Sequence, residues 1–278
     1  MTVEFSMPPL RLGASRGHGG DVKALLPRLG KLLSTVLDTA VTPTLARSYD
    51  DLSEELLAGK VDIAWLPPLL LARATLRGAT LAAVPQRGGW LTYRSALLVR
   101  KDQPVIGLSR MRGLRAAWVD RNSGSGYLFP RLELAMLGAM PERVFSSESF
   151  FGSAAKAAAA VVAGEADLCA CFVSDAAARA PDRALEEVRR TLGASTDGLR
   201  VLHVTEPIPP DGFALASTHA TPVQTRVTAA LLALHETAAG RQVLGELLQA
   251  ERLSAVNEAL LRSLRSWVDA AASRDLSG

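Results

Sequence analysis

The stretch LRAAWVDRNSGSGYLFPRLELAML, residues 114–137, decides the fold. Its apolar run from Leu114 to Asp120 predicts a β-strand, the following NSGSG predicts a loop, and the apolar spacing from Tyr127 onward predicts a helix. A strand that passes through a glycine-rich turn directly into a helix is typical of proteins with largely parallel sheets. We therefore expect an α/β fold.

The loop of this stretch also predicts an anion-binding site at Ser123, Gly124, Ser125 and Gly126. The first N–H groups of a helix have no partner inside the helix, and the helix dipole places partial positive charge there. Glycine lets the backbone approach a ligand closely, and serine hydroxyls add donors, so an oxyanion can be held without a lysine. The alternative is an ordinary serine cap without a ligand.

The alternation of strands and helices continues on both sides of this stretch. Two extended crossings near residues 95–102 and 200–215 divide the chain into two lobes, and ligands of such folds bind beyond the carboxyl ends of the strands. We expect one lobe from residues 1–98 and 206–278 and a second from residues 99–205. The other expected strands are 10–15, 41–48, 61–67, 95–102, 143–146 and 166–174, and the other expected helices are 22–37, 49–60, 153–163 and the region from 222 onward.

The composition fits a globular protein and disfavours several functional classes. Of the 278 residues, 48% are apolar and 21% are charged, so the chain can form a core. A net charge of +3 and an aromatic content of 5% disfavour nucleic-acid binding. The sequence does not contain a run of the roughly 18 apolar residues that a membrane span needs. Its first fifteen residues do not read as a signal peptide, which predicts a cytoplasmic protein, or a periplasmic one if a leader has been removed.

The sequence predicts no metal site and no cofactor. Cys169 and Cys171 lie two residues apart and the four histidines are dispersed, so metal ligands do not cluster in the sequence. We expect both cysteines to be small buried apolar residues. Motifs of nucleotide-binding loops, zinc proteases and serine hydrolases are missing, which gives little support to an enzyme.

Further candidate ligand contacts fall at the ends of predicted elements. Ser153 precedes a predicted helix and offers a second set of N–H groups, although a simple cap is the favoured interpretation. Trp65 and Tyr93 fall at strand ends, where each is either a pocket wall or a core residue, and the tyrosine hydroxyl can donate to an oxyanion. Asp175 follows the predicted strand at 166–174 and completes the set.

Five segments, spread in order from residue 49 to residue 215, carry a family resemblance. They are YDDLSEELLAGKVDIAWLPP (49–68), TYRSALLVRKD (92–102), MRGLRAAWVDRNSGSGYLFPRLEL (111–134), FFGSAAKAAAAVVAGEADL (150–168) and EPIPPDGFAL (206–215). In order and spacing they resemble the substrate-binding proteins of phosphonate, phosphite and phosphate ABC transporters.

The resemblance implies a type 2 periplasmic-binding-protein fold, in which two lobes close on a ligand like a hinged clamp. It implies that residues 123–126 hold the oxyanion and that Tyr93 contacts it. It also implies that Trp65 lies near the family's strand-end aromatic residue and that Ser153 occupies the family's glycine-serine-histidine position. The function implied is non-catalytic binding of a phosphonate, phosphite or phosphate, with an ABC permease as the partner.

Two residues depart from the family pattern. Gly124 stands where members often have threonine, and Ala154 stands where they have histidine, so two donors are missing. A hydrogen bond to a charged group contributes about 1.5–3 kcal/mol, and the loss therefore predicts a larger or less charged ligand. Two alternative functions use the same fold: a cytoplasmic enzyme or biosynthetic-pathway binding protein of the chorismate dehydratase class, and a sensor domain that docks onto a kinase.

Overall fold

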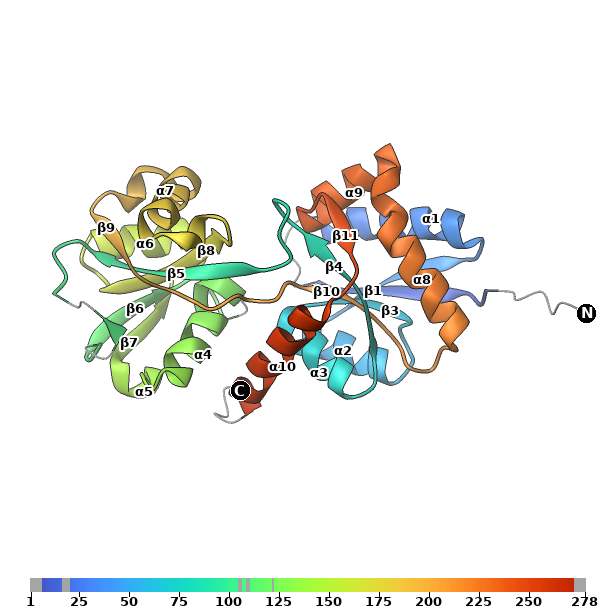
Figure 1. Ribbon diagram of the computed structural model, residues 1–278, viewed down its shortest axis with the longest axis horizontal. Helices are drawn as coiled ribbons and strands as arrows, with labels where there is room; N and C mark the ends of the chain where they lie inside the picture. The colour runs from blue at the N-terminus through green and yellow to red at the C-terminus, as the bar shows by residue number, and fades with distance from the viewer. Residues whose placement is uncertain (1–6, 17–20, 105–106, 109–110, 122, 273–278) are drawn as a thin grey trace, which may run out of the picture. The chain divides into compact units, whose positions relative to one another are not determined.

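The computed structural model describes residues 7–16, 21–104, 107–108, 111–121 and 123–272. The chain divides into two compact units (Figure 1), and each is described by itself. Unit 1 contains the described residues up to Leu91 together with Pro209–Val268, and unit 2 contains the described residues of Thr92–Ile208 together with residues 269–272.

The boundaries of the units differ by a few residues from the lobes expected from the sequence, which were 1–98 with 206–278 and 99–205. Strand β5 (Tyr93–Arg100) accounts for the first difference, because it pairs with β8 and β9 of unit 2 along its length. Ile208 accounts for the second, because its backbone pairs with Tyr93.

Unit 1 is a six-stranded sheet with helices on both faces. The sheet order is β11-β4-β10-β3-β1-β2, with β1 parallel to β2 and β3, and β10 antiparallel to β3 and β4. One apolar core lies under α1, α8 and α9, and a second lies under α2 and α3. The elements are β1 (Leu10–Ser15), α1 (Val22–Leu37), β2 (Val41–Ala46), α2 (Tyr49–Leu57), β3 (Ile63–Leu66), α3 (Pro68–Leu76), β4 (Thr80–Gln86), β10 (Gly212–Leu215), α8 (Thr221–Ala233), α9 (Ala238–Leu248), β11 (Arg252–Ser254) and α10 (Glu258–Ala272, within unit 1 to Val268).

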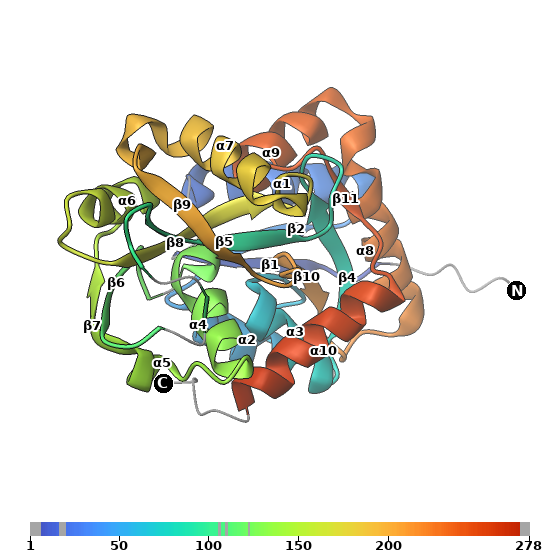
Figure 2. The same cartoon turned by 60° about the vertical axis from the view of Figure 1, so that its left-hand side comes forward.

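Unit 2 is a five-stranded sheet, also covered on both faces. Its order is β7-β6-β8-β5-β9, with β6 parallel to β7 and β8, and β5 antiparallel to β8 and β9. Helices α6 and α7 cover one face, and α4 and α5 lie on the other (Figure 2). The further elements are β6 (Leu114–Trp118), α4 (Phe129–Met136), α5 (Pro141–Val144), β7 (Phe145–Phe150), α6 (Ala154–Val162), β8 (Leu168–Ser174), α7 (Pro181–Leu192) and β9 (Leu199–Val204).

The two sheets share one topology. The order β2-β1-β3-β10-β4 in unit 1 corresponds to β7-β6-β8-β5-β9 in unit 2, with the same parallel and antiparallel neighbours. The predicted α/β fold is therefore confirmed. Among the described residues, no helix combines the length and the apolar character that crossing a bilayer requires.

Candidate functional site

The loop after β6 leads into helical backbone that begins earlier than expected, with a wide turn before α4. A wide turn over Gly124–Leu128 precedes α4, and its backbone bonds run from Leu128 N–H to Ser123 O (2.9 Å) and from Phe129 N–H to Gly124 O. Pro130 has no N–H, so it cannot donate to the carbonyl of Gly126, which instead accepts the N–H of Val119 (3.2 Å). This single wider turn is of the kind that often occurs at functional sites.

Ser123 caps this helix and Gly126 lets the turn close against β6. The Ser123 hydroxyl accepts the Gly126 N–H at 3.1 Å. A Cβ atom on Gly126 would lie 2.3 Å from Cγ2 of Val119 and 2.7 Å from Oγ of Ser123. Because those distances are far inside van der Waals contact, only glycine fits at this position.

Tyr93 and Ser95, both on β5, lie beside the helix start. The buried Ser95 hydroxyl donates to the carbonyl of Ser125 at 2.6 Å. The Tyr93 hydroxyl lies 2.7 Å from where a Cβ atom of Gly124 would stand. A threonine at position 124 would therefore displace the Tyr93 hydroxyl. The glycine at this position leaves room for that hydroxyl next to the first turn of the helix.

Ser153 begins a second helix beside the first. Its hydroxyl accepts the N–H of Lys156 at 3.3 Å, so it caps α6 as the favoured interpretation expected. The N–H of Gly152 donates to the carbonyl of Val119 at 2.8 Å, while Val119 donates to Gly126. Val119, at the end of β6, thus links the two helix starts by its backbone.

The remainder of α4 is anchored as well. The buried carboxylate of Glu133 lies 2.5 Å from Nε2 of His203 and accepts the backbone N–H of Glu206 at 2.7 Å. The anchoring at both ends fixes the direction of the helix start relative to the sheet of unit 2. Pre-organised donors of this kind hold an anion without reorganisation.

Asp175 is engaged with cations and hydroxyls of unit 2. Thr92 donates its hydroxyl to the carboxylate, and Nε of Arg94 lies 2.9 Å from it. Arg94 also donates to the carbonyl of Thr205 at 2.8 Å. The carboxylate therefore ties the end of β8 to the start of β5, and Arg94 extends this link to the segment after β9. We do not include Asp175 in the proposed anion site.

Trp65 belongs to unit 1 and is 5% exposed. Its indole N–H donates to the carboxylate of Asp211 at 2.6 Å, and its ring stacks on Phe213. Asp211 also pairs with Arg87 at 2.8 Å. These contacts place Trp65 in the core of unit 1, and a role as a pocket wall stays a prediction.

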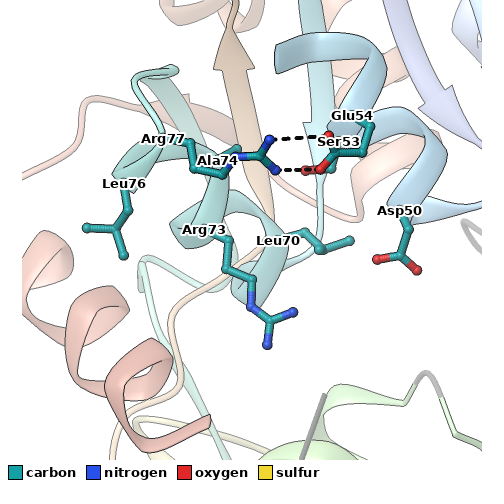
Figure 3. A pocket seen from close by; sticks show the side chains of 8 residues that line it. All are labelled: Asp50, Ser53, Glu54, Leu70, Arg73, Ala74, Leu76 and Arg77. Atoms are coloured by element: carbon teal, nitrogen blue, oxygen red, sulfur yellow. Dashed lines mark hydrogen bonds and ion pairs between the residues drawn. The ribbon is translucent and has the colours of Figure 1, made fainter. Parts of the chain in front are cut away.

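A surface hollow of about 350 Å³ lies between α2 and α3 of unit 1 (Figure 3). An ion pair of 2.5 Å between Arg77 and Glu54 spans the two helices beside it. The hollow mixes acidic and basic side chains and thus differs in charge from a site for an anion. Its lining consists of Asp50, Ser53, Glu54, Leu70, Arg73, Ala74, Leu76 and Arg77.

The two cysteines are buried and unpaired with each other, as expected. Burial raises the pKa of Cys169 well above its usual value and that of Cys171 to about 12. Both are therefore protonated at neutral pH and have the weak nucleophilicity of a thiol. Within the described ranges, metal-ligating side chains do not gather in groups of three or more.

Of the candidates from the sequence, the structure brings together residues 123–126 and Tyr93, and it places Ser153 beside them through Val119. Sequence reasoning missed Ser95 and Val119. The only signal for Ser95 was a hydroxyl at the start of an otherwise apolar strand, and Val119 acts through its backbone, which sequence does not reveal.

Comparisons with known proteins complete the description of the site. A model of the family described as "ABC transporter, phosphonate, periplasmic substrate-binding protein" matches residues 18–261. The "Phosphate-import protein PhnD" of Mycolicibacterium smegmatis is 32% identical over 118 residues, which is 41% of this chain and 37% of that protein. The match thus spans well under half of the relative.

Two solved structures share the fold. XAC2383 from Xanthomonas citri bound to chloride superposes with a TM-score of 0.75 at 20% identity, over 97% of this chain and 99% of that one. PhnD1 from Prochlorococcus marinus in complex with methylphosphonate gives a TM-score of 0.66 at 19% identity, over 96% and 98% of the two chains.

Proposed function

The chain belongs to the family of periplasmic phosphonate substrate-binding proteins of ABC transporters, and from this premise we propose that it binds a small oxyanion, namely a phosphonate, phosphite or phosphate. The family consists of non-catalytic binding components, so this chain is not an enzyme. The comparisons give no support to the chorismate-dehydratase-like alternative or to the sensor domain.

The observation that carries the proposal is the convergence at the start of the helix that follows Ser123. We expect the first N–H groups of this turn, the hydroxyls of Ser123 and Ser125 and the phenol of Tyr93 to supply donors to the anion. Ser95 holds the turn against β5. Donors held in place by the fold bind an oxyanion with little ordering cost.

Ser153 and its neighbouring N–H groups form the second part of the proposed site. The backbone of Val119 joins the start of α6 to the start of α4. An anion between two helix starts gains from both dipoles. Because the donors are backbone dipoles and hydroxyls, the site does not need a surplus of basic residues, which agrees with the net charge of +3.

We further propose that the protein acts in the periplasm with an ABC permease and its ATPase. The family places its members there, in ABC importers. The chain passes from unit 1 to unit 2 after Leu91, returns after Ile208, and is assigned to unit 2 again after Val268, within α10. We expect the ligand-occupied form to be the form that the permease recognises.

The experiment is a thermal-unfolding titration with methylphosphonate, phosphite, phosphate and sulfate. A ligand at 100 times its dissociation constant adds about 2.7 kcal/mol to the free energy of unfolding, and we expect at least one phosphorus oxyanion to raise the Tm accordingly. Tyr93→Phe removes one donor and should weaken that ligand about ten-fold. In the control, Tyr127→Phe removes a hydroxyl that accepts from Arg131 instead and should leave affinity unchanged. A Tm that none of the four anions moves contradicts the proposed function.

A further inference from the structure

Phe172 is an exposed aromatic residue on the sheet face that carries the proposed oxyanion site. It is 44% exposed, although it lies in the interior of strand β8. The residues before it on the same face of β8, Leu168 and Ala170, are buried in the core under α4. The buried part of this face of β8 therefore ends at Ala170, and Phe172 is the next side chain along the strand on the same face.

The strand register places Phe172 beside the residues that hold the helix start. In the β5–β8 pair Phe172 stands directly opposite Ser95, whose hydroxyl binds the carbonyl of Ser125. Tyr93 is the next residue of β5 on this face, and its ring stacks on that of Phe172 with centroids 5.6 Å apart and planes inclined by 28°. The hydroxyl of the same tyrosine lies at Gly124.

Two rings thus extend from the donor cluster as one continuous apolar surface. Apolar surface that remains in water gains free energy when a ligand covers it, and aromatic rings favour offset stacking on other rings. An oxyanion with an organic substituent, bound at the helix start, would bring that substituent against Phe172. Inorganic phosphate and phosphite have no such group.

We propose that Phe172 and Tyr93 form an aromatic platform that binds the organic substituent of the ligand, so that the site prefers organophosphonates with an aryl or bulky alkyl group to inorganic phosphate and phosphite. This inference rests on the proposed oxyanion site. Phe172 acts as a specificity-determining residue, while the helix start holds the anionic group. The absence of donor side chains at Gly124 and Ala154 agrees with a ligand that draws part of its affinity from an apolar group.

The test measures the dissociation constants of phenylphosphonate, methylphosphonate and phosphate by calorimetric titration of the full chain. In the native protein phenylphosphonate should bind about ten-fold more tightly than methylphosphonate. Phe172→Ala should remove this advantage and leave methylphosphonate within about two-fold of its native value. Phe172→Leu keeps an apolar side chain in case the alanine variant does not fold, and should remove the larger part of the advantage.

Leu137→Ala is the matched control, because Leu137 is 56% exposed in unit 2 but lies at the other end of α4. It should keep the native preference. Equal affinity for the phenyl and methyl compounds, or a preference that survives both Phe172 variants, overturns the platform and leaves the oxyanion site standing. Failure of all three ligands to bind overturns the oxyanion site and the platform together.

Discussion

Units 1 and 2 have the same arrangement of central strands, but the helix that follows β1 in unit 1 starts differently from the helix that follows β6 in unit 2. In both units an arginine on the middle parallel strand, β1 or β6, pairs with the aspartate that directly precedes the neighbouring strand, β3 or β8. These arginine–aspartate pairs, the clasps of the two units, measure 2.8 Å for Arg11 with Asp62 and 2.9 Å for Arg115 with Asp167. Each arginine also donates to the carbonyl of the glycine three residues before its aspartate. The scaffold is thus duplicated down to individual hydrogen bonds.

We expect the two helix starts to differ in whether they can bind an anion, because their capping residues differ in charge. Helix α1 of unit 1 is capped by Asp21, whose carboxylate accepts the N–H of Ala24 at 3.1 Å. The corresponding helix of unit 2 is capped by the neutral Ser123. A carboxylate at the cap already neutralises the partial positive charge of the helix end, whereas a serine leaves that charge to a ligand. The comparison teaches that one capping residue separates a structural helix end from a candidate binding site.

The largest expected effect concerns the clasp that the units share. Asp62→Asn removes the charge partner of Arg11, and this substitution should lower the free energy of unfolding by about 3 kcal/mol. Asp167→Asn should cost about 2 kcal/mol, because the Asp167 carboxylate is more exposed (13% against 4%) and lacks the second partner that His219 gives Asp62. Chemical denaturation measures both changes. The exposed pair of Glu54 and Arg77 is the control, and Glu54→Gln should change stability much less than either aspartate substitution because water screens this pair.

The pH dependence of stability has a defined sign for these clasps. Burial opposes ionisation of Asp62, but the hydrogen bonds from Arg11 and His219 outweigh it and hold its pKa below the usual 3.8. The hydrogen bond from Arg115 lowers the pKa of Asp167 in the same way. Both carboxylates therefore stabilise the fold above pH about 4, and this contribution is lost as pH falls through their lowered values. Asp62→Asn and Asp167→Asn should each flatten the acid limb of the curve, and unchanged limbs would show that the clasps are not what acid breaks.

The next effect exchanges the caps of the two units. Ser123→Asp gives unit 2 the cap of unit 1 and places a carboxylate in the proposed cradle. Affinity for methylphosphonate should fall at least about 100-fold, which is about 2.7 kcal/mol, while stability stays within about 0.5 kcal/mol because aspartate caps as well as serine. The reverse change, Asp21→Ser, should leave binding unaffected. Calorimetric titration measures the affinity of both variants for methylphosphonate. Unaltered affinity of Ser123→Asp would show that the capping residue does not determine anion binding.

A smaller difference is expected between alanine substitutions of two glycines, Gly126 in unit 2 and Gly245 in unit 1. Gly126→Ala drives a methyl group into Val119 and should cost about 2 kcal/mol of stability as well as ligand affinity. Gly245→Ala in α9 of unit 1 meets nothing within 4 Å, and alanine should stabilise that helix by about 0.5–1 kcal/mol. Thermal unfolding measures the pair, and a tolerated Gly126→Ala would show that the turn at the helix start relaxes without cost.

The local pattern of residues 114–137 was enough to predict the strand, the loop and the helix, because apolar spacing there is regular and the breakers are glycines. It was not enough to place the first helical residue. Ser123 and Pro130 together impose the wider turn, which begins at Gly124, and α4 itself begins at Phe129, whereas the apolar spacing predicted a helix from Tyr127. Competition between a cap and a missing N–H is a matter of geometry that spacing does not show.

Elements that escaped the sequence include α3, β4 and α7, and β11 interrupts the region from residue 222 onward that was expected to be helical. Strand β4 contains Pro85 and a short apolar run, and α7 buries only Ala184 and Val188 along a highly charged segment, so the apolar signal of both is weak. The convergence of Tyr93, Ser95 and Phe172 on the helix start also lay beyond sequence reasoning, since it depends on the register of β5 with β8. Family resemblance supplied Tyr93, and only the strand pairing supplied the other two.

The most direct test of the central claim is an NMR titration of glycine-labelled protein with methylphosphonate. If the helix start of unit 2 holds the anion, the amide signals of Gly124 and Gly126 should shift most among the glycines, because their N–H groups lie at the proposed cradle. Saturating shifts confined to other glycines, such as Gly88 or Gly245 of unit 1, with Gly124 and Gly126 unmoved, would contradict the account.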